Sequence, residues 1–222
     1  MLNILAIKAV PSVSWSSPHP LNLRPRLLTL LMLAIGLIIL GVGEAMLVAA
    51  GEGNSPWTVL AEGLGLALGL NIGWATFVVS ASVLLLWIPL RQTPGIGTLA
   101  NAVIIAAAIG FSLPLLPNPE QYWLRIAEAV VGILLVGLGS GLYLMAHLGA
   151  GPRDGLMTGL QRLSGLPIAS VRTAIELTAV AIGWLLGGTV GMSTLLFALG
   201  IGAAVSLGLA VVQYCSPANR WS

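Results

Sequence analysis

The residues best suited to chemistry lie in one glycine-rich turn, residues 149–155 (GAGPRDG). Proline suits the first turn of a helix, so a helix is predicted to begin at Pro152, and its free N–H groups could hold an anion or a polar substrate group. Arg153 would add positive charge there, and Asp154 could cap the helix or pair with an arginine. The alternative is a compact turn between two helices with an Arg–Asp pair on the surface.

Three more charged residues lie within apolar runs, where charge is costly and usually faces protein or a water-filled cavity. Arg172 and Glu176 are four residues apart, on one face of a helix, and either line a pathway or form a structural ion pair. Glu44 could carry a proton, bind a cation or hydrogen-bond a neighbouring helix. The first half of the chain is predicted to supply an outer group of binding residues, namely Pro56, Thr58, Glu62 and Thr76.

No catalytic set, metal site or cofactor is predicted. His147 lies seven residues before Asp154, but no nucleophile motif completes the pair. His19 and His147 are too few for a histidine-based metal site, and Cys215 is the single cysteine. We therefore expect a protein that is not an enzyme.

The composition indicates what these residues are embedded in. Of the 222 residues, 57% are hydrophobic and only 7% are charged, against about 25% charged in a typical soluble domain. Most of the surface must face an apolar medium, so the lipid bilayer is the expected partner. The net charge of +2 is too small to indicate nucleic-acid binding.

Hydrophobic runs separated by Gly, Pro or charge predict the membrane helices. Six runs are close to the roughly 20 residues that cross a bilayer, and they cover residues 28–50, 73–90, 97–116, 122–147, 168–186 and 192–214. Two shorter segments, 56–69 and 152–165, each begin with Pro and end with Gly. We interpret both as half-helices that enter the membrane and turn back.

The arginines and lysines predict the orientation. Lys8, Arg24 and Arg26 precede the first run, which favours a cytoplasmic N-terminus. Six alternating spans then return the C-terminus to the cytoplasm, with Arg91, Arg153, Arg162, Arg172 and Arg220 on the same side.

The two halves of the chain resemble each other. A shift of 96 positions aligns residues 41–70 with 137–166, with 10 identities in 30 positions and no gap. The matched positions include the Gly and Pro residues of both short segments. This predicts a duplication.

Each copy holds three spans, so the second copy should insert upside down relative to the first, as in many transporters. The predicted fold is therefore an all-α, polytopic membrane bundle arranged as an inverted internal repeat. The expected divisions are a flexible N-terminal lead (1–27), two membrane repeats (28–116 and 117–214) and a C-terminal tail (215–222).

Residues 141–202, which contain the GPRDG run, closely resemble the YczE/YyaS/YitT group of bacterial membrane proteins. The stretches PWTVLAEGL and RQTPGIGTLAN of the first half are also similar to that group, and the resemblance covers about residues 28–212. It implies a multi-pass protein of the bacterial inner membrane. It assigns no substrate, reaction or site residue.

Two functions fit these features. The first is a secondary transporter or permease for a small solute, with Arg153, Asp154, Arg172 and Glu176 forming the inner half of its site. The second is a non-transporting accessory or regulator that binds a partner membrane protein or a second copy of the chain. Half-helices that converge on a polar cavity would favour the first, and a dry, closed centre would favour the second.

Overall fold

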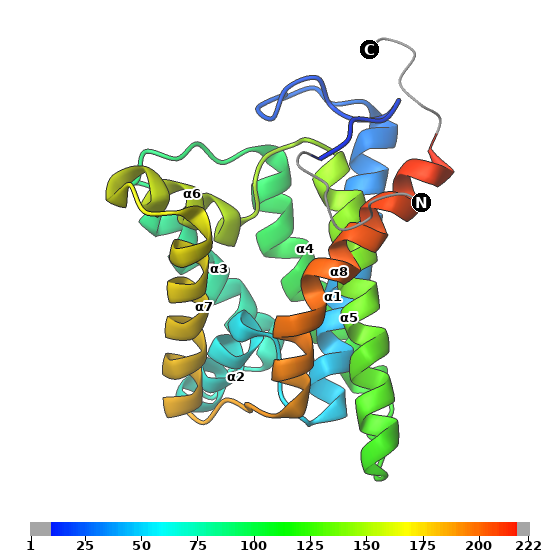
Figure 1. The fold of residues 1–222 in the computed structure, drawn as a ribbon, viewed down its shortest axis with the longest axis vertical. Coiled ribbons are helices and arrows are strands. Elements are labelled where there is room, and N and C mark those ends of the chain that lie inside the picture. The colour runs from blue at the N-terminus through cyan, green and yellow to red at the C-terminus, as the bar shows by residue number, and fades with distance from the viewer. Residues whose placement is uncertain (1–9, 217–222) are drawn as a thin grey trace.

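The computed structural model describes residues 10–216, and the regular structure of this part of the chain is helical (Figure 1). Eight α-helices and one short 3₁₀ helix follow one another, and none of the described residues forms an extended sheet strand. Their bounds are α1 (Leu27–Ala50), α2 (Pro56–Leu68), α3 (Ile72–Leu86), α4 (Ile96–Ser112) continued by η1 (Leu113–Leu115), α5 (Tyr122–Met145), α6 (Pro152–Ser164), α7 (Ile168–Leu185) and α8 (Met192–Cys215).

Five of these helices are long and apolar enough to cross a membrane. The pair α2 and α3, which is bent by 112°, would be a sixth candidate if the two helices form one span. Because α3 has only 15 residues, it covers roughly 22 Å at 1.5 Å per residue. The helical class is therefore as the sequence predicts, and the sixth span is a short helix joined to a half-helix.

The two short segments are helices of 13 residues each. Each begins with Pro at the first helical position and ends at a glycine in the left-handed conformation, Gly69 or Gly165, both with φ of 67°. Proline has no N–H to lose at a helix start, and glycine adopts positive φ without strain, so sequence chemistry sets both ends.

The backbone repeats at the spacing found in the sequence. Shifting α2 by 96 positions gives the bounds of α6, and the first residues of α3 and α4 map onto those of α7 and α8. All eight residues with positive φ also fall into four pairs 96 positions apart, which are Gly51 and His147, Gly53 and Gly149, Gly69 and Gly165, and Arg91 and Gly187.

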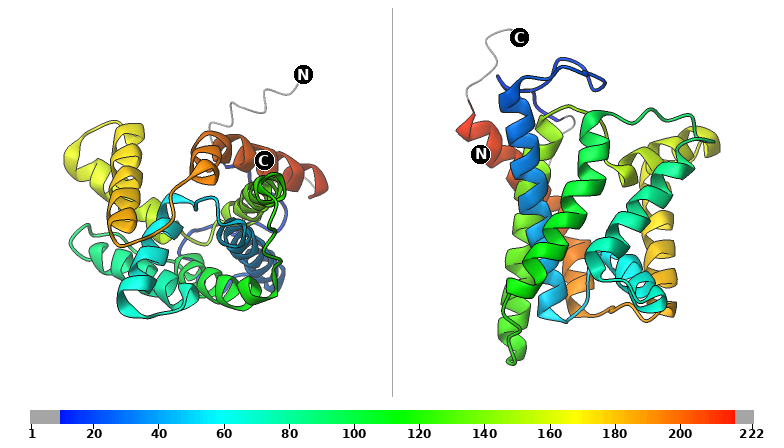
Figure 2. Two further views of the ribbon diagram at one scale, coloured as in Figure 1. Left: turned by 90° about the horizontal axis from the view of Figure 1, so that it is seen from below. Right: turned by 180° about the vertical axis from the view of Figure 1, so that it is seen from behind.

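Corresponding helices run in opposite directions. In Figure 1, α1 descends and α5 rises, α3 rises and α7 descends, and α4 descends and α8 rises. The half-helix α2 lies toward the lower end of the bundle and α6 toward the upper end, which the view from behind in Figure 2 also shows.

The central contact is between α1 and α5, which pack through glycines. A Cβ on Gly43 would lie 2.6 Å from the carbonyl oxygen of Gly132, and one on Gly139 would lie 2.5 Å from that of Gly36. Only residues without side chains allow two helices to approach this closely, as is typical of helix pairs in membranes.

Two groups of helices build the interior. The larger hydrophobic cluster joins α1, α4, α5 and α8, and the smaller joins α2, α3, α6 and α7. The half-helices therefore belong to a second layer beside the long-helix bundle, and the principal polar cavity lies between the two layers.

The N-terminal lead differs from the sequence-based expectation. Residues 10–26 were expected to be flexible, but Val13 and Trp15 are buried in the larger cluster. The Ser17 N–H donates to the Ala146 carbonyl at 3.0 Å, and the Thr29 hydroxyl donates to the Trp15 carbonyl at 2.5 Å. The buried side chains of Val13 and Trp15 thus anchor this otherwise polar segment. Residues 1–9 and 217–222, including Lys8 and Arg220, lie outside the described residues.

Candidate substrate cavity

The N-termini of the two half-helices meet at one cavity of about 260 Å³. Pro56 and Trp57 of α2 line it from one side, and the segment Gly151–Asp154 at the start of α6 lines it from the other. A helix N-terminus carries a partial positive charge, so two such ends at one cavity favour negative groups there. The remaining walls come from α1, α4, α5, α7 and α8.

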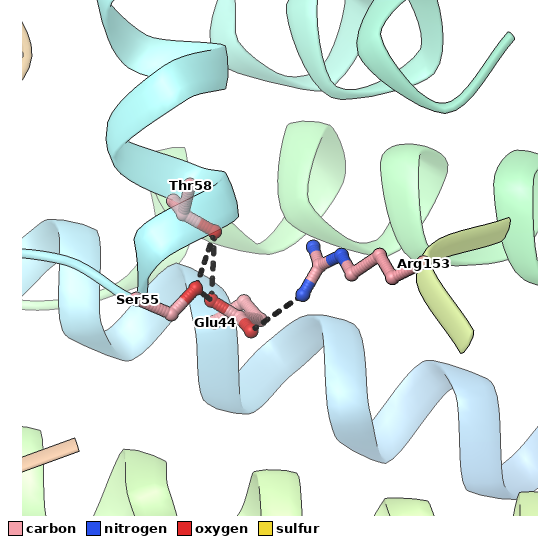
Figure 3. A network of polar contacts seen from close by, with 4 residues as sticks. All are labelled: Glu44, Ser55, Thr58 and Arg153. Carbon is pink, nitrogen blue, oxygen red and sulfur yellow. Dashed lines mark hydrogen bonds and ion pairs between the residues drawn. The ribbon is translucent and has the colours of Figure 1, made fainter. Parts of the chain in front are cut away.

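Glu44 of α1 is bound to the start of α2 (Figure 3). Its Oε2 accepts hydrogen bonds from the hydroxyls of Ser55 and Thr58, each at 2.7 Å. Ser55 immediately precedes the helix, so its hydroxyl serves the carboxylate and makes no capping bond to the helix backbone. The carboxylate is only 1% exposed, and its Oε1 has no hydrogen-bond partner.

Arg153 approaches that same oxygen from α6. Its Nη1 lies 4.0 Å from Glu44 Oε1, a long ion pair (Figure 3). The guanidinium lies over the Trp57 ring, 5.3 Å from the centroid, within the range of a cation–π interaction. Trp57 and Arg153 are 96 positions apart, so they are corresponding residues of the two half-helices, and they face each other at the junction of the halves.

Asp154 follows in the first turn of α6, where the helix dipole favours a carboxylate. Tyr143 of α5, almost fully buried, donates its hydroxyl to Asp154 Oδ2 at a long 3.4 Å. The Trp87 indole N–H donates to the Pro152 carbonyl at 3.0 Å and fixes the position of the α6 start.

Arg172 and Glu176 lie at the rim of the cavity on α7. Arg172 Nε donates to Glu176 Oε1 at 2.9 Å, and the two side chains are 55% and 35% exposed. They thus form the expected ion pair and also line the cavity.

Seven of the predicted substrate-binding residues line this cavity, namely Glu44, Pro56, Pro152, Arg153, Asp154, Arg172 and Glu176. Thr58 does not line the cavity, but its hydroxyl donates to Glu44, which does. Thr76 is buried beside a much smaller space of about 10 Å³ on the far side of Trp57 and Arg153, and its hydroxyl has no partner.

Glu62 lies elsewhere. Its carboxylate accepts from the Asn54 amide at 2.8 Å, and from the N–H and hydroxyl of Thr189 at 2.6 and 3.0 Å. These bonds join the loop before α2 to the loop before α8, which makes Glu62 a structural residue. Sequence reasoning placed it in the site because a charge on an apolar half-helix gives no indication of its partners.

The other fourteen lining residues were not predicted, and Trp57, Asn101 and Tyr143 are among them. The alignment of the halves contained the signal for Trp57, because it is the counterpart of Arg153. Tyr143 and Asn101 belong to long helices. Because these helices are apolar on every side, the sequence does not indicate which of their residues face the cavity. Among the described residues, no group of three His, Cys, Asp or Glu could hold a metal ion.

His147 lies outside the spans, in the loop between α5 and α6, with a positive φ of 52°. Partial burial lowers the pKa of its imidazole below the ordinary value of 6.5. It does not line the cavity.

Comparisons with known proteins agree with a membrane protein and give no substrate. Residues 27–208 match a family described as "Family of unknown function (DUF6198)". A relative from Haemophilus influenzae, named "Uncharacterized protein", is 39% identical over 206 residues, which are 93% of this chain and 94% of the relative.

Two relatives come from Bacillus subtilis. The "Uncharacterized membrane protein YczE" is 35% identical over 78% of this chain and 82% of its own length. The "Uncharacterized protein YyaS" is 27% identical over 73% of this chain and 83% of its own length. These matches agree with the resemblance found in residues 141–202. No solved structure matches the chain.

Proposed function

The chain belongs to the DUF6198 family and is a multi-pass integral membrane protein, and on that premise we propose that it is a secondary transporter or permease for a small solute. One observation carries the proposal: two half-helix N-termini converge on a cavity lined by two arginines and three carboxylates. Charged groups within a membrane bundle are costly and are retained mainly where they bind or move a solute.

The arrangement of the halves supports the same proposal. Corresponding helices run in opposite directions, and left-handed residues pair at a spacing of 96 positions. We interpret the fold as an inverted repeat, in which the cavity at the junction of the halves becomes accessible alternately from each side.

We place the protein in the bacterial plasma membrane with both termini in the cytoplasm. Arg24 and Arg26 precede α1, Arg91 follows α3, and Arg162 ends α6, so all four lie toward one end of the bundle. Positive residues mark the cytoplasmic side of membrane proteins.

We assign the cavity to binding and not to catalysis. No histidine or cysteine lines it, and its carboxylates are paired with arginine, tyrosine or hydroxyl groups. A closed and dry centre would favour the alternative, an accessory role, whereas a cavity of about 260 Å³ lined by five charged residues supports the transporter proposal.

The proposal is tested with purified protein in liposomes. Uptake is measured for a panel of labelled organic anions, organic cations, zwitterions and neutral solutes, with protein-free liposomes as reference. We expect protein-dependent uptake of one class, abolished by Arg153→Ala and retained by Arg162→Ala, which removes an exposed arginine from the other end of the same helix. No protein-dependent uptake of any class, with the wild type monodisperse, would rule out the proposal.

A further inference from the structure

The Arg153 guanidinium has unused hydrogen-bonding capacity. It carries five N–H donors, yet within the described residues it makes only the 4.0 Å ion pair with Glu44 and a cation–π contact with Trp57, and no hydrogen bond. The side chain is 37% exposed, and the space it faces is the cavity. A planar fork of donors at the start of a half-helix suits a carboxylate, sulfonate or phosphate oxygen pair.

Glu44 limits how such an anion can bind. Its carboxylate is 1% exposed, and among residues 10–216 Arg153 is its only cationic partner within 4.0 Å. An anion that turns the guanidinium toward itself leaves a buried, uncompensated charge on Glu44, which is strongly unfavourable. A proton on Glu44 Oε1, the oxygen without a hydrogen bond, removes that cost.

The charged groups around Glu44 do not replace Arg153. Asp154 on α6 and Glu176 on α7 are negative, Arg172 is bound to Glu176, and Tyr143 on α5 donates to Asp154. The cavity-lining residues of α2, α4 and α8 are all uncharged. Proton uptake is therefore the available compensation for Glu44 when an anion occupies Arg153.

The opposite wall of the cavity is apolar. Phe197, Ile201 and Val205 of α8 face the charged end of α6 across the space. α3 packs along α4, whereas its counterpart α7 makes no comparable contact with α8. The apolar wall thus belongs to a helix, α8, that is not packed against α7.

We propose that the cavity binds organic monoanions with an apolar body, and that each is bound together with one proton on Glu44. The anionic group lies on Arg153 and the apolar body lies against α8. The proton comes from water, so the charge of the occupied site equals that of the empty one. This inference rests on the proposed function, since it names the substrate class and coupling ion of the same cavity.

The test uses hexanesulfonate, which stays anionic at every working pH, so any proton taken up must bind the protein. Binding to wild-type protein in detergent is followed by calorimetry, and proton uptake by an indicator dye in weak buffer. We expect about one proton per bound sulfonate, and an affinity that strengthens by up to about tenfold per unit of falling pH. Ethanesulfonate should bind at least tenfold more weakly, since each buried methylene adds roughly a factor of four.

Glu44→Gln separates the two parts of the proposal, because an amide oxygen can still accept from Ser55 and Thr58. This variant should bind hexanesulfonate without proton uptake, independently of pH, and at least tenfold more tightly than wild type at pH 8. Arg153→Ala should lose at least about tenfold in affinity at every pH, since a charge-assisted hydrogen bond is lost. Glu120→Gln, at an exposed carboxylate, is the matched control and should behave as wild type.

Three results would overturn the inference. One is binding of hexyltrimethylammonium, with proton release, in place of hexanesulfonate. Another is proton uptake that persists in Glu44→Gln and disappears in Asp154→Asn. The third is no sulfonate binding by protein that transports another solute class in liposomes, in which case the proposed function stands while the substrate class does not.

Discussion

The two halves of the molecule share a backbone plan but differ in what they enclose. In the first half, α3 lies against α4. In the second, α7 makes no comparable contact with α8, and residues of both helices line the cavity. Of the α7 residues, only Val171, Ala179 and Gly183 are buried. Equivalent segments have thus become a closed wall in one half and an open one in the other.

The two halves also differ at single pairs of contacting residues. The Trp87 ring, at the end of α3, packs directly on Gly155 of α6. At the corresponding contact, Gly183 of α7 packs on Val59 of α2, with large and small residues exchanged. The repeated backbone plan supplies two short-helix ends, and different side chains at corresponding positions make the cavity between them chemically asymmetric.

Exchanging these side chains should produce the largest effect. Gly155→Val places a side chain within the Trp87 ring and should destabilise the protein by about 3 kcal/mol or more. Combining it with Trp87→Gly recreates the Val59–Gly183 contact, so the double variant should be more stable than the sum of the single effects by at least about 1 kcal/mol. Thermal unfolding in detergent measures both.

Gly202→Ala is the control for that series, because its Cβ would meet nothing within 4 Å. It should leave the melting temperature within the range of wild type. Strict additivity of Gly155→Val and Trp87→Gly would show that the two corresponding contacts are not equivalent.

A smaller loss of stability is expected from a substitution at a position where the two halves differ in charge. Arg153→Ala leaves the buried Glu44 carboxylate without its cation and should destabilise the protein by about 3 kcal/mol. Glu44→Gln in the same chain removes that charge, so the double variant should recover part of the loss in a denaturation series. If Arg153→Ala lowers the free energy of unfolding equally in the wild type and in Glu44→Gln, the 4.0 Å pair contributes nothing to stability.

The open and closed walls should differ in accessibility. Val205 of α8 lines the cavity, and its counterpart 96 positions earlier is Ile109 of α4, 1% exposed. In a chain with Cys215→Ser, a cysteine at Val205 should react with a water-soluble maleimide at least about tenfold faster than one at Ile109, since burial blocks access to the thiolate. Equal labelling rates would contradict the asymmetry of the walls.

The smallest effect concerns the loop residues Gly51 and His147, which correspond and both have positive φ. His147→Gly relieves left-handed strain but adds chain entropy to the unfolded state, so at neutral pH it should stabilise the protein by no more than about 1 kcal/mol. Melting temperatures of the two proteins give this difference.

The same variant has a predicted pH dependence. Because burial lowers the pKa of His147 in the folded state, the unfolded chain binds the proton more readily below about pH 6.5. Wild-type stability should therefore fall between pH 7 and pH 5 by more than that of His147→Gly. A parallel decline of both would show that other groups control the acid response.

Several features followed from sequence because they depend on local chemistry. Pro56 and Pro152 fix helix starts, Gly69 and Gly165 fix helix ends, and the 13-residue length between them follows. Glu44, Arg172 and Glu176 were candidates because charge in an apolar run is costly. Arg153 and Asp154 were candidates because they follow Pro152 in a glycine-rich turn, and all five residues line one cavity.

Other features could not be read in this way. Glu62 binds Thr189, and Trp15 is buried against the helices, through contacts between segments far apart in the sequence. In long apolar runs every face is similar, because lipid and protein interior have the same polarity, so the facing of Tyr143 and Asn101 carried no periodic signal.

The sequence alone predicted apolar helices, two of them short, in two halves that resemble each other. Helix length, helix ends and repetition can all be read from the order of residues along the chain. Only the tertiary structure decided that the two short helices point their N-termini at one cavity, with Arg153 over Trp57 and beside Glu44. The reason is physical: which side chains meet depends on close packing between distant segments, such as the glycine contacts of α1 with α5, and no local pattern encodes that packing.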